Sequence, residues 1–246
     1  MGLKCSLITM YNDKAIAQEF EENLATQQEI DYELLSIDNY GGEYSSIRAA
    51  YNEAFQKSCG DYIVFLHPDI RFLTNHTLAE VIKKCEEIQD FGVVGIAGAA
   101  SGESGERVVY TSIVHGEKKA NPGEEITDRI EVQTVDECMF IVKREVFERT
   151  RFAMKEGFHL YAVEYCLDMI LEGRTNYAIP AQIWHMSSGQ SMDPSYITQL
   201  ENVLDVYRKD FDVLYTTVKK WPTSGLLPYI YRRYYYVKRY LERKFG

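Results

Sequence analysis

The stretch DYIVFLHPDI, residues 61–70, decides the fold that this sequence predicts. Residues 62–66 form an unbroken apolar run, which is typical of a strand buried on both faces of a parallel sheet. The run ends abruptly in His67, Pro68 and Asp69. An imidazole, a rigid ring and a carboxylate at this position indicate a ligand-binding or catalytic site, because ligands of open parallel sheets bind beyond the carboxyl ends of the strands.

The segments around this stretch alternate between strand and helix patterns. Strand patterns occupy residues 3–10 and 32–39 and recur in GVVGIAGA from Gly92. Helix patterns fill the intervals, and they begin after Asn12 or Asp13, after Ser45 or Ser46, and at about Asn75. This order predicts an α/β protein with a doubly wound, mostly parallel central sheet flanked by helices.

Beyond residue 100 the alternation stops, and glycines break the chain into loops and short β-like runs. A helix around residues 161–172, a strand around 177–184 and further helical segments follow. No repeat or low-complexity linker separates the two halves. We therefore expect one α/β domain over residues 1–222 and a helical C-terminal extension over residues 223–246.

The composition bounds the class of protein. Hydrophobic residues make up 46% and charged residues 26%, as in a globular chain, and no run approaches the ~18 apolar residues of a membrane span. MGLKCSLITM is too short for a signal peptide, and five widely spaced cysteines without a CxxC pair indicate reduced core residues. We therefore predict a cytoplasmic protein. Its net charge of −10 argues against nucleic acid as a partner.

The C-terminal segment from Gly225 differs in charge from the rest of the chain. Six basic residues against one acid give it a net charge of +5 and leave −15 on the remainder. As a helix, it would carry Ile230, Tyr234, Val237, Leu241 and Phe245 on one face, and Arg232, Tyr236, Arg239 and Arg243 on the other. Such a helix suits an anionic membrane surface, the acidic body of the same chain or a second subunit of a homo-oligomer, and the sequence leaves all three open.

Polar side chains stand at the ends of four predicted strands. These residues are Thr9 with Tyr11, Asp38 with Asn39, His67 with Asp69, and His185. Because the carboxyl ends of parallel strands meet at one edge of a sheet, the four ends together predict a site there. Each one alone is equally typical of a turn, since Asp and Asn often bond their own backbone after a strand.

His67 and Asp69 are two positions apart, so their side chains leave an extended chain on the same face. Pro68 stiffens this arrangement, because it favours extended backbone at the preceding residue and fixes its own φ. A carboxylate held there could bind Mg²⁺ or Mn²⁺, and the cation would let an acidic protein accept a diphosphate. A Pro-Asp turn followed by a helix cap is the structural alternative.

The order of several motifs resembles a known family. The motifs are YNDK, SIDN, RAAYNEAF, CGDYIVFLHPDI, GVVGIAGA, VDECMFIVKREVF, FHLYAVEYCLDMILEGRTNYAIPA, IWHMSSGQSM and KKW, over roughly residues 3–222. This order is similar to that of GT-A fold glycosyltransferases near family 2, in their bacterial glycosyltransferase-like branch. The resemblance implies a GT-A (Rossmann-like) fold and an inverting, metal-dependent transfer of sugar from a UDP- or GDP-type donor. The implied acceptor is a glycan or lipid-linked molecule, as in the synthesis of cell-envelope polysaccharide.

The resemblance also implies roles for single positions. Asp69 falls on the last acid of the family's DXD motif, which contacts the metal and the diphosphate, and His67 replaces the first acid. His185 matches a histidine that completes the metal site in some members. The positions implied for binding of the nucleotide donor are Thr9, Tyr11, Asp38, Asn39, Asn52, His67 and Asp69.

One position departs from the family pattern. The family's general base is an aspartate that aligns with Ala162, and alanine cannot take the proton of an acceptor hydroxyl. The candidate substitutes are Glu164, Asp136 and Glu137. Two alternatives stay open: a non-catalytic descendant that binds nucleotide or glycan and scaffolds partners, and a nucleotidyltransferase. MYNDKA disfavours the latter, because it lacks a glycine-rich, basic phosphate loop.

Overall fold

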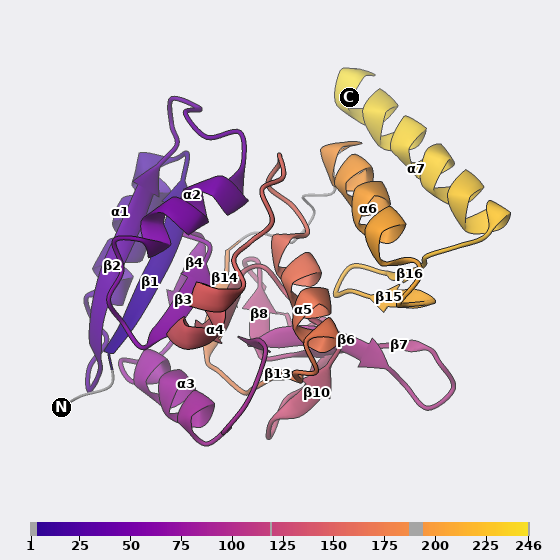
Figure 1. The fold of residues 1–246 in the computed structure, drawn as a ribbon. Coiled ribbons are helices and arrows are strands. Elements are labelled where there is room, and N and C mark those ends of the chain that lie inside the picture. The colour runs from indigo at the N-terminus through magenta and orange to yellow at the C-terminus, as the bar shows by residue number, and fades with distance from the viewer. Residues whose placement is uncertain (1–3, 119, 187–193, 246) are drawn as a thin grey trace.

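The computed structural model describes residues 4–118, 120–186 and 194–245. A seven-stranded sheet lies at its centre in the order β10-β13-β5-β12-β3-β1-β2 (Figure 1). Its strands are β1 (Lys4–Tyr11), β2 (Asp31–Asp38), β3 (Tyr62–Leu66), β5 (Val94–Gly95), β10 (Ile130–Val132), β12 (Met139–Lys143) and β13 (Asn176–Ala178).

Three smaller sheets complete the second half of the chain. One contains β6 (Ala97–Ser101), β7 (Arg107–Thr111), β9 (Glu124–Glu125) and β11 (Thr134–Val135). The next contains β4 (Ile70–Phe72), β8 (Ile113–His115) and β14 (Ile183–His185), and the last is the hairpin of β15 (Val213–Tyr215) and β16 (Lys220–Pro222).

The predicted α/β alternation is confirmed in the first part of the chain. Strand β1 pairs in parallel with both β2 and β3. The predicted strand from Gly92 divides, because the chain leaves the central sheet after Gly95 and continues as β6 in the neighbouring sheet. Strand β12 lies antiparallel between β3 and β5. The central sheet is therefore mixed, with its parallel part at β2, β1 and β3 and a second parallel pair at β5 and β13.

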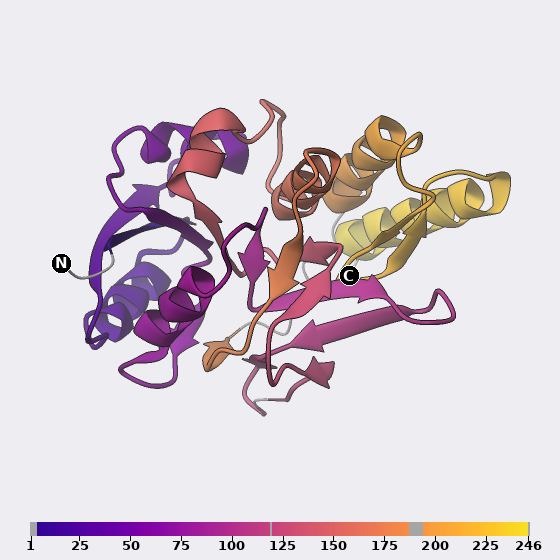
Figure 2. The ribbon, with the colours of Figure 1, turned by 60° about the horizontal axis from the view of Figure 1, so that its bottom comes forward.

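Helices cover both faces of the central sheet (Figure 2). They are α1 (Lys14–Leu24), α2 (Ile47–Phe55), α3 (Thr77–Glu86), α4 (Arg144–Arg149), α5 (Tyr161–Leu171), α6 (Pro194–Tyr207) and α7 (Leu226–Phe245). Val64 and Leu66 of β3 pack in the core cluster with α1 and α3, whereas Ile63 and Phe65 pack in the cluster with α2, α4 and α5. Strand β3 is thus buried on both faces, as its continuous apolar run predicts.

Two of the predicted helix starts have side-chain caps. Asp13 accepts a hydrogen bond from the Ala15 amide at 2.8 Å, and Ser46 accepts one from the Ala49 amide at 3.3 Å. These contacts satisfy amide groups that have no partner inside the first helical turn. They also fix where the loops after β1 and β2 enter the helices, beside the strand ends that carry the candidate site.

The three-stranded sheet brings distant parts of the chain together. Strand β14 pairs antiparallel with β4, so that His185 lies opposite Ile70. On its other side β14 pairs in parallel with β8, so that His185 lies opposite His115. This register places His185 beside the segment that follows β3, where His67 and Asp69 lie.

Helix α7 packs on α6 at the C-terminal end of the molecule (Figure 1). Arg232 and Tyr235 are buried against the body, and Arg232 donates to the Pro222 carbonyl at 3.2 Å. The predicted apolar face points the other way, since Ile230 is 52% and Val237 is 53% exposed. The helix thus docks on its own chain through the face that was predicted to be basic and leaves much of the apolar face uncovered. The side chains of Arg239, Arg243 and Phe245 lie outside the described residues.

Candidate active site

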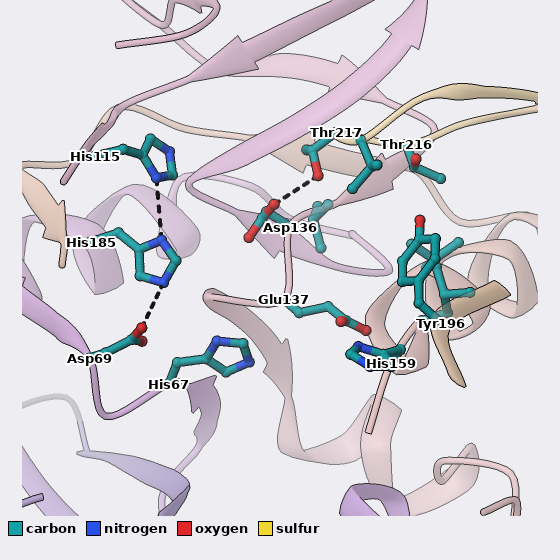
Figure 3. A pocket seen from close by; sticks show the side chains of 14 residues that line it. His67, Asp69, His115, Asp136, Glu137, His159, His185, Tyr196, Thr216 and Thr217 are labelled. Atoms are coloured by element: carbon teal, nitrogen blue, oxygen red, sulfur yellow. Dashed lines mark hydrogen bonds and ion pairs between the residues drawn. The ribbon is translucent and has the colours of Figure 1, made fainter. Parts of the chain in front are cut away.

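Three potential metal ligands meet beyond the carboxyl end of β3. His67 follows β3, Asp69 precedes β4, and His185 ends β14. One ligand atom from each of these side chains lies within 4.8 Å of the other two, and His185 Nε2 lies 3.1 Å from Asp69 Oδ2 (Figure 3). The fold thus brings together Asp69 and His185, the two predicted metal ligands, and adds His67.

The second oxygen of Asp69 suits a cation. Its Oδ1 atom is buried and has no hydrogen-bond partner among the described residues, which is costly for a carboxylate. One carboxylate and two imidazoles are ligands that a divalent ion such as Mn²⁺ accepts, and three protein ligands leave coordination positions for substrate oxygens. The residues present therefore fit a metal ion.

Asp69 and His185 favour the charged forms of each other. Burial alone would raise the pKa of Asp69, but the hydrogen bond and charge of His185 outweigh it, so that this pKa lies below its ordinary value. Burial likewise disfavours charge on His185, but the hydrogen bond to Asp69 outweighs it and raises the His185 pKa. Below this raised pKa, a metal ion must displace a proton from His185 when it binds.

A further histidine orients His185. His115 ends β8, and its Nδ1 atom lies 3.2 Å from Nδ1 of His185. In the metal-free protein His185 Nε2 donates to Asp69. With a cation in place of that proton, donation from His185 Nδ1 to His115 would leave the Nε2 lone pair for the cation. Hydrogen bonds of this kind fix the ring and tautomer of a metal-binding histidine.

Tyr161, the first residue of α5, holds His67. Its hydroxyl lies 3.1 Å from His67 Nε2 and donates to the Glu137 carbonyl at 3.3 Å. Burial lowers the pKa of His67 below its ordinary value. The ring is therefore neutral near neutral pH, which is the form that binds a metal.

Two cavities meet at the cluster. The large cavity, of about 730 Å³, lies over the carboxyl ends of β1 and β2. The small cavity, of about 290 Å³, lies between β8, the start of α5 and the β15–β16 hairpin. Residues that line both cavities are His67, Asp69, Glu137 and His159. The two volumes together are large enough for two ligand groups on either side of the cluster.

The residues predicted to bind the nucleotide divide into two groups. Tyr11 and Asn39 line the large cavity, and Asn39 also fixes the loop after β2 through the Tyr44 backbone. Asp38 does not line this cavity; its carboxylate accepts from the Tyr40 amide at 2.8 Å and pairs with Lys14 at 3.5 Å. The Asx turn that the sequence left open for Asp38 is therefore present.

Thr9 and Asn52 do not line either cavity. Thr9 is buried in β1. Asn52 lies on α2, and its amide donates to the Phe152 carbonyl at 2.9 Å. Both predictions rested on position along the chain, whereas the orientation of the strand and helix decides which side chains reach the cavity.

Asp136 and Glu137 follow β11 and differ in environment. Asp136 accepts from the Cys138 amide at 3.0 Å and from the Thr217 hydroxyl at 2.7 Å; these bonds outweigh burial, so that its pKa lies below the ordinary value. Burial raises the pKa of Glu137 to about 8, although the nearby charge of Arg48 opposes the shift. Both carboxylates reach the small cavity, but Glu137 also reaches the large one.

Glu164 is separated from both cavities. It is 3% exposed, lies 3.1 Å from Arg48 and is also paired with Lys155. Arg48 in turn donates to the His159 carbonyl at 3.2 Å. The first candidate base thus lies in a buried ion pair that joins α2 to α5.

Sequence reasoning missed several residues that line the small cavity. They are His115, His159, Tyr196, Thr216 and Thr217. Four of the five histidines in the chain line this one cavity. His115 ends an apolar strand, as His67 does, and this signal was available in the sequence; nothing local distinguishes the other four residues.

A family model described as "Glycosyltransferase like family" matches residues 6–207 of this chain. The chain belongs to this glycosyltransferase-like family. A protein of Fuscovulum blasticum called "ATP synthase subunits region ORF 6" is 22% identical over 182 residues, which cover 73% of this chain and 72% of that protein. Its name does not state an activity.

Solved glycosyltransferases share the fold. TarS residues 1–349 of S. aureus, in complex with UDP-GlcNAc, superimposes with a TM-score of 0.60 at 12% identity, over 85% of this chain and 68% of that 1–349 chain. The mannosyltransferase PcManGT of Pyrobaculum calidifontis, in complex with GDP-Man and Mn²⁺, has a TM-score of 0.57 at 12% identity, over 96% of this chain and 70% of its own. The glycosyltransferase-like protein described here therefore has the GT-A fold that the motifs predict.

Proposed function

We propose that this protein transfers a sugar from a nucleotide-diphosphate donor to a glycan or lipid-linked acceptor. The observation that carries the proposal is the cluster of His67, Asp69 and His185 at the junction of two cavities, with a buried Asp69 oxygen that lacks a partner among the described residues. Family membership supports the reaction class. The similar structures that hold UDP-GlcNAc or GDP-Man support the donor class.

The large cavity is the site that we assign to the donor. Tyr11 and Asn39 would contact the nucleoside, and Asp69 would face the diphosphate. The described lining of this cavity contains no Lys or Arg, so the side chains themselves supply no fixed positive charge for phosphates. Mn²⁺ or Mg²⁺ held by His67, Asp69 and His185 would supply that charge and stabilise the departing diphosphate.

We propose direct displacement with inversion. The acceptor hydroxyl attacks the anomeric carbon while the bond to the diphosphate breaks, so one carboxylate near the acceptor suffices to take the proton. With a cation held by His67, Asp69 and His185, the cluster would hold the diphosphate on one side of the anomeric carbon, and the small cavity would leave room for the acceptor on the other. Holding both reactants in line in this way removes much of the entropic cost of the reaction.

Helix α7 supports a site of action at an anionic membrane surface. None of the described helices is long and apolar enough to cross a bilayer, but the outward face of α7 exposes Ile230, Tyr234 and Val237. Lys238 and Lys244 are exposed on the same helix. Apolar and aromatic side chains with basic neighbours suit the cytoplasmic leaflet, which carries anionic lipids. We propose that α7 holds the protein there, beside a lipid-linked acceptor.

Calorimetric titration with UDP and GDP, each with and without Mn²⁺, tests the core of the proposal. We expect binding that depends on Mn²⁺ and weakens at least about tenfold in Asp69→Ala, because a metal ligand is lost. Asp61→Ala, which removes an exposed carboxylate at the other end of β3, is the matched control. If neither UDP nor GDP binds, the proposal is overturned.

Ala162 motivates a second candidate function, in which the protein binds a nucleotide sugar without turnover. Ala162 is the second residue of α5 and is fully buried, so that the family's base is absent at that position. This candidate predicts tight nucleotide-sugar binding with no release of nucleotide, and a gain of turnover in Ala162→Asp. Nucleotide release by the wild-type protein would exclude it.

A further inference from the structure

Glu137 lies where the two cavities meet. Of the described residues that line both cavities, Asp69 and Glu137 are the carboxylates, and Asp69 belongs to the candidate metal cluster. In Figure 3 Glu137 points toward His159 and Tyr196, on the side of the pocket away from Asp69 and His185. Asp69 is therefore part of the metal cluster, whereas Glu137 lies on the opposite side of the junction between the two cavities.

Glu137 also contacts the start of α5, beside the alanine. Its Oε1 atom accepts a hydrogen bond from the Ala162 amide at 3.4 Å. The N-terminal turn of a helix favours a negative charge, because its amides lack partners within the helix. The Ala162 side chain packs in the core and lines neither cavity. Glu137 reaches the junction from the turn between β11 and β12.

The small cavity indicates what the acceptor must be. Its described lining contains hydroxyl groups from Tyr196, Thr216 and Thr217, and no Lys or Arg. Besides Tyr196, its titratable groups are three acids and four histidines: Asp69, Asp136, Glu137, His67, His115, His159 and His185. At the end of the cavity away from the metal cluster, Asp136 and the three hydroxyls offer a phosphate no Lys or Arg, whereas they suit the hydroxyl groups of a neutral sugar. A volume of about 290 Å³ is at the lower end of the roughly 300–1,000 Å³ found for ligand pockets, and it suits one sugar ring.

We propose that Glu137 is the general base of the transfer and that the small cavity binds the acceptor as a neutral, hydroxyl-bearing sugar unit. The inference rests on the proposed function. The acceptor hydroxyl gives its proton to the Glu137 carboxylate and forms a bond to the anomeric carbon of the donor. The bond from that carbon to the diphosphate breaks, and the nucleoside diphosphate leaves with the electron pair.

The first test is kinetic. UDP release from UDP-GlcNAc is to be measured in the presence of Mn²⁺, with water, a neutral methyl glycoside or a sugar phosphate as the acceptor. UDP binding is to be measured separately by calorimetry. We expect methyl glycosides to stimulate release and sugar phosphates to leave it unchanged. Glu137→Gln should lower the stimulated rate about 10²- to 10⁴-fold while UDP affinity stays within about twofold. Glu131→Gln, an exposed glutamate on β10, is the matched control.

The second test does not depend on turnover. Val218 is partly buried and lines the small cavity, so Val218→Trp should fill it. Saturation-transfer NMR on the protein loaded with UDP and Mg²⁺ should detect methyl glycoside on the wild type and none on Val218→Trp, with UDP affinity retained. Equal binding to both proteins would overturn the assignment of this cavity.

The remaining outcomes separate the two proposals. If no nucleotide binds, the proposed function fails and the inference fails with it. If UDP binds but Glu137→Gln releases it from the donor at the wild-type rate, the inference alone is overturned. If UDP binds and the wild type releases none with any acceptor, the transfer reaction fails together with the inference, and the binding-only candidate is supported.

Discussion

His115 and His185 face each other through their Nδ1 atoms at 3.2 Å, although 70 residues separate them in the chain. Only one of the two nitrogens can carry the shared proton, so the contact couples the tautomers of the two rings. When His185 Nδ1 donates to His115, its Nε2 atom, which faces Asp69, can act as a metal ligand.

His115→Phe should weaken Mn²⁺ binding without removing a ligand from the cluster of His67, Asp69 and His185. Loss of the residue that hydrogen-bonds to a metal ligand typically lowers metal affinity by roughly 10- to 100-fold. Calorimetry with Mn²⁺ measures the effect, and His115→Asn, which keeps a polar partner, should lose less. Equal affinity in all three proteins would show that His115 does not orient His185.

Mn²⁺ affinity should fall as the pH is lowered. The pKa of His185 is raised above its ordinary value of 6.5 by Asp69, so below that raised pKa a proton competes with the metal. Each further unit of pH then costs about tenfold in affinity for one displaced proton. Calorimetry between about pH 5.5 and 8 checks the slope. In the metal-free protein, the same pair stabilises the fold, and the His185 contribution is lost as the pH rises through its raised pKa.

The transfer rate should rise with pH until about 8. Burial raises the pKa of Glu137 to about 8, and only the ionised carboxylate can accept a proton, so the rate below this value should fall about tenfold per unit. Initial rates at saturating donor measure the profile. Glu137→Gln should abolish this dependence, and a wild-type rate that is flat between about pH 6 and 8 would contradict the assignment.

Glu164→Ala should lower stability and leave the chemistry in place. It would leave the buried Arg48 unpaired, and breaking such a pair typically costs about 3–5 kcal/mol in the free energy of unfolding. Urea denaturation measures this difference. The double variant Arg48→Met/Glu164→Leu should be less destabilised, because no unpaired charge remains. A rate loss for folded Glu164→Gln like that of Glu137→Gln would instead assign the base to Glu164.

Ile230→Asp/Val237→Asp should reduce binding to anionic membranes. The two substitutions place charges on the exposed apolar face of α7, and Lys238→Ala should cost about 1 kcal/mol, or about fivefold, by removing one basic contact. Cosedimentation with vesicles that contain phosphatidylserine measures both effects, with phosphatidylcholine vesicles as the control. A dimer in light scattering that the double substitution dissociates would show that a second copy covers this face.

The sequence alone was sufficient for the fold class. Continuous burial of β3, capping by Asp13 and Ser46 and the order of the motifs depend on local patterns. Hydrophobic periodicity, helix caps and turns are each determined by residues that are close together in the sequence. The same reasoning identified His67, Asp69 and His185 as strand-end residues. It could not show that they meet, since β14 reaches β4 only through long-range pairing.

Tertiary structure decided the rest of the site. The register of β14 against β8 placed His115 on His185, and α5 docking turned Glu164 into a buried partner of Arg48 while it brought the Ala162 amide to Glu137. Which carboxylate faces the cavity depends on the rotation of a helix against the sheet, and core packing over the whole domain fixes that rotation. A sequence position names a candidate residue, but the packing of distant segments determines its partners and thereby its chemistry.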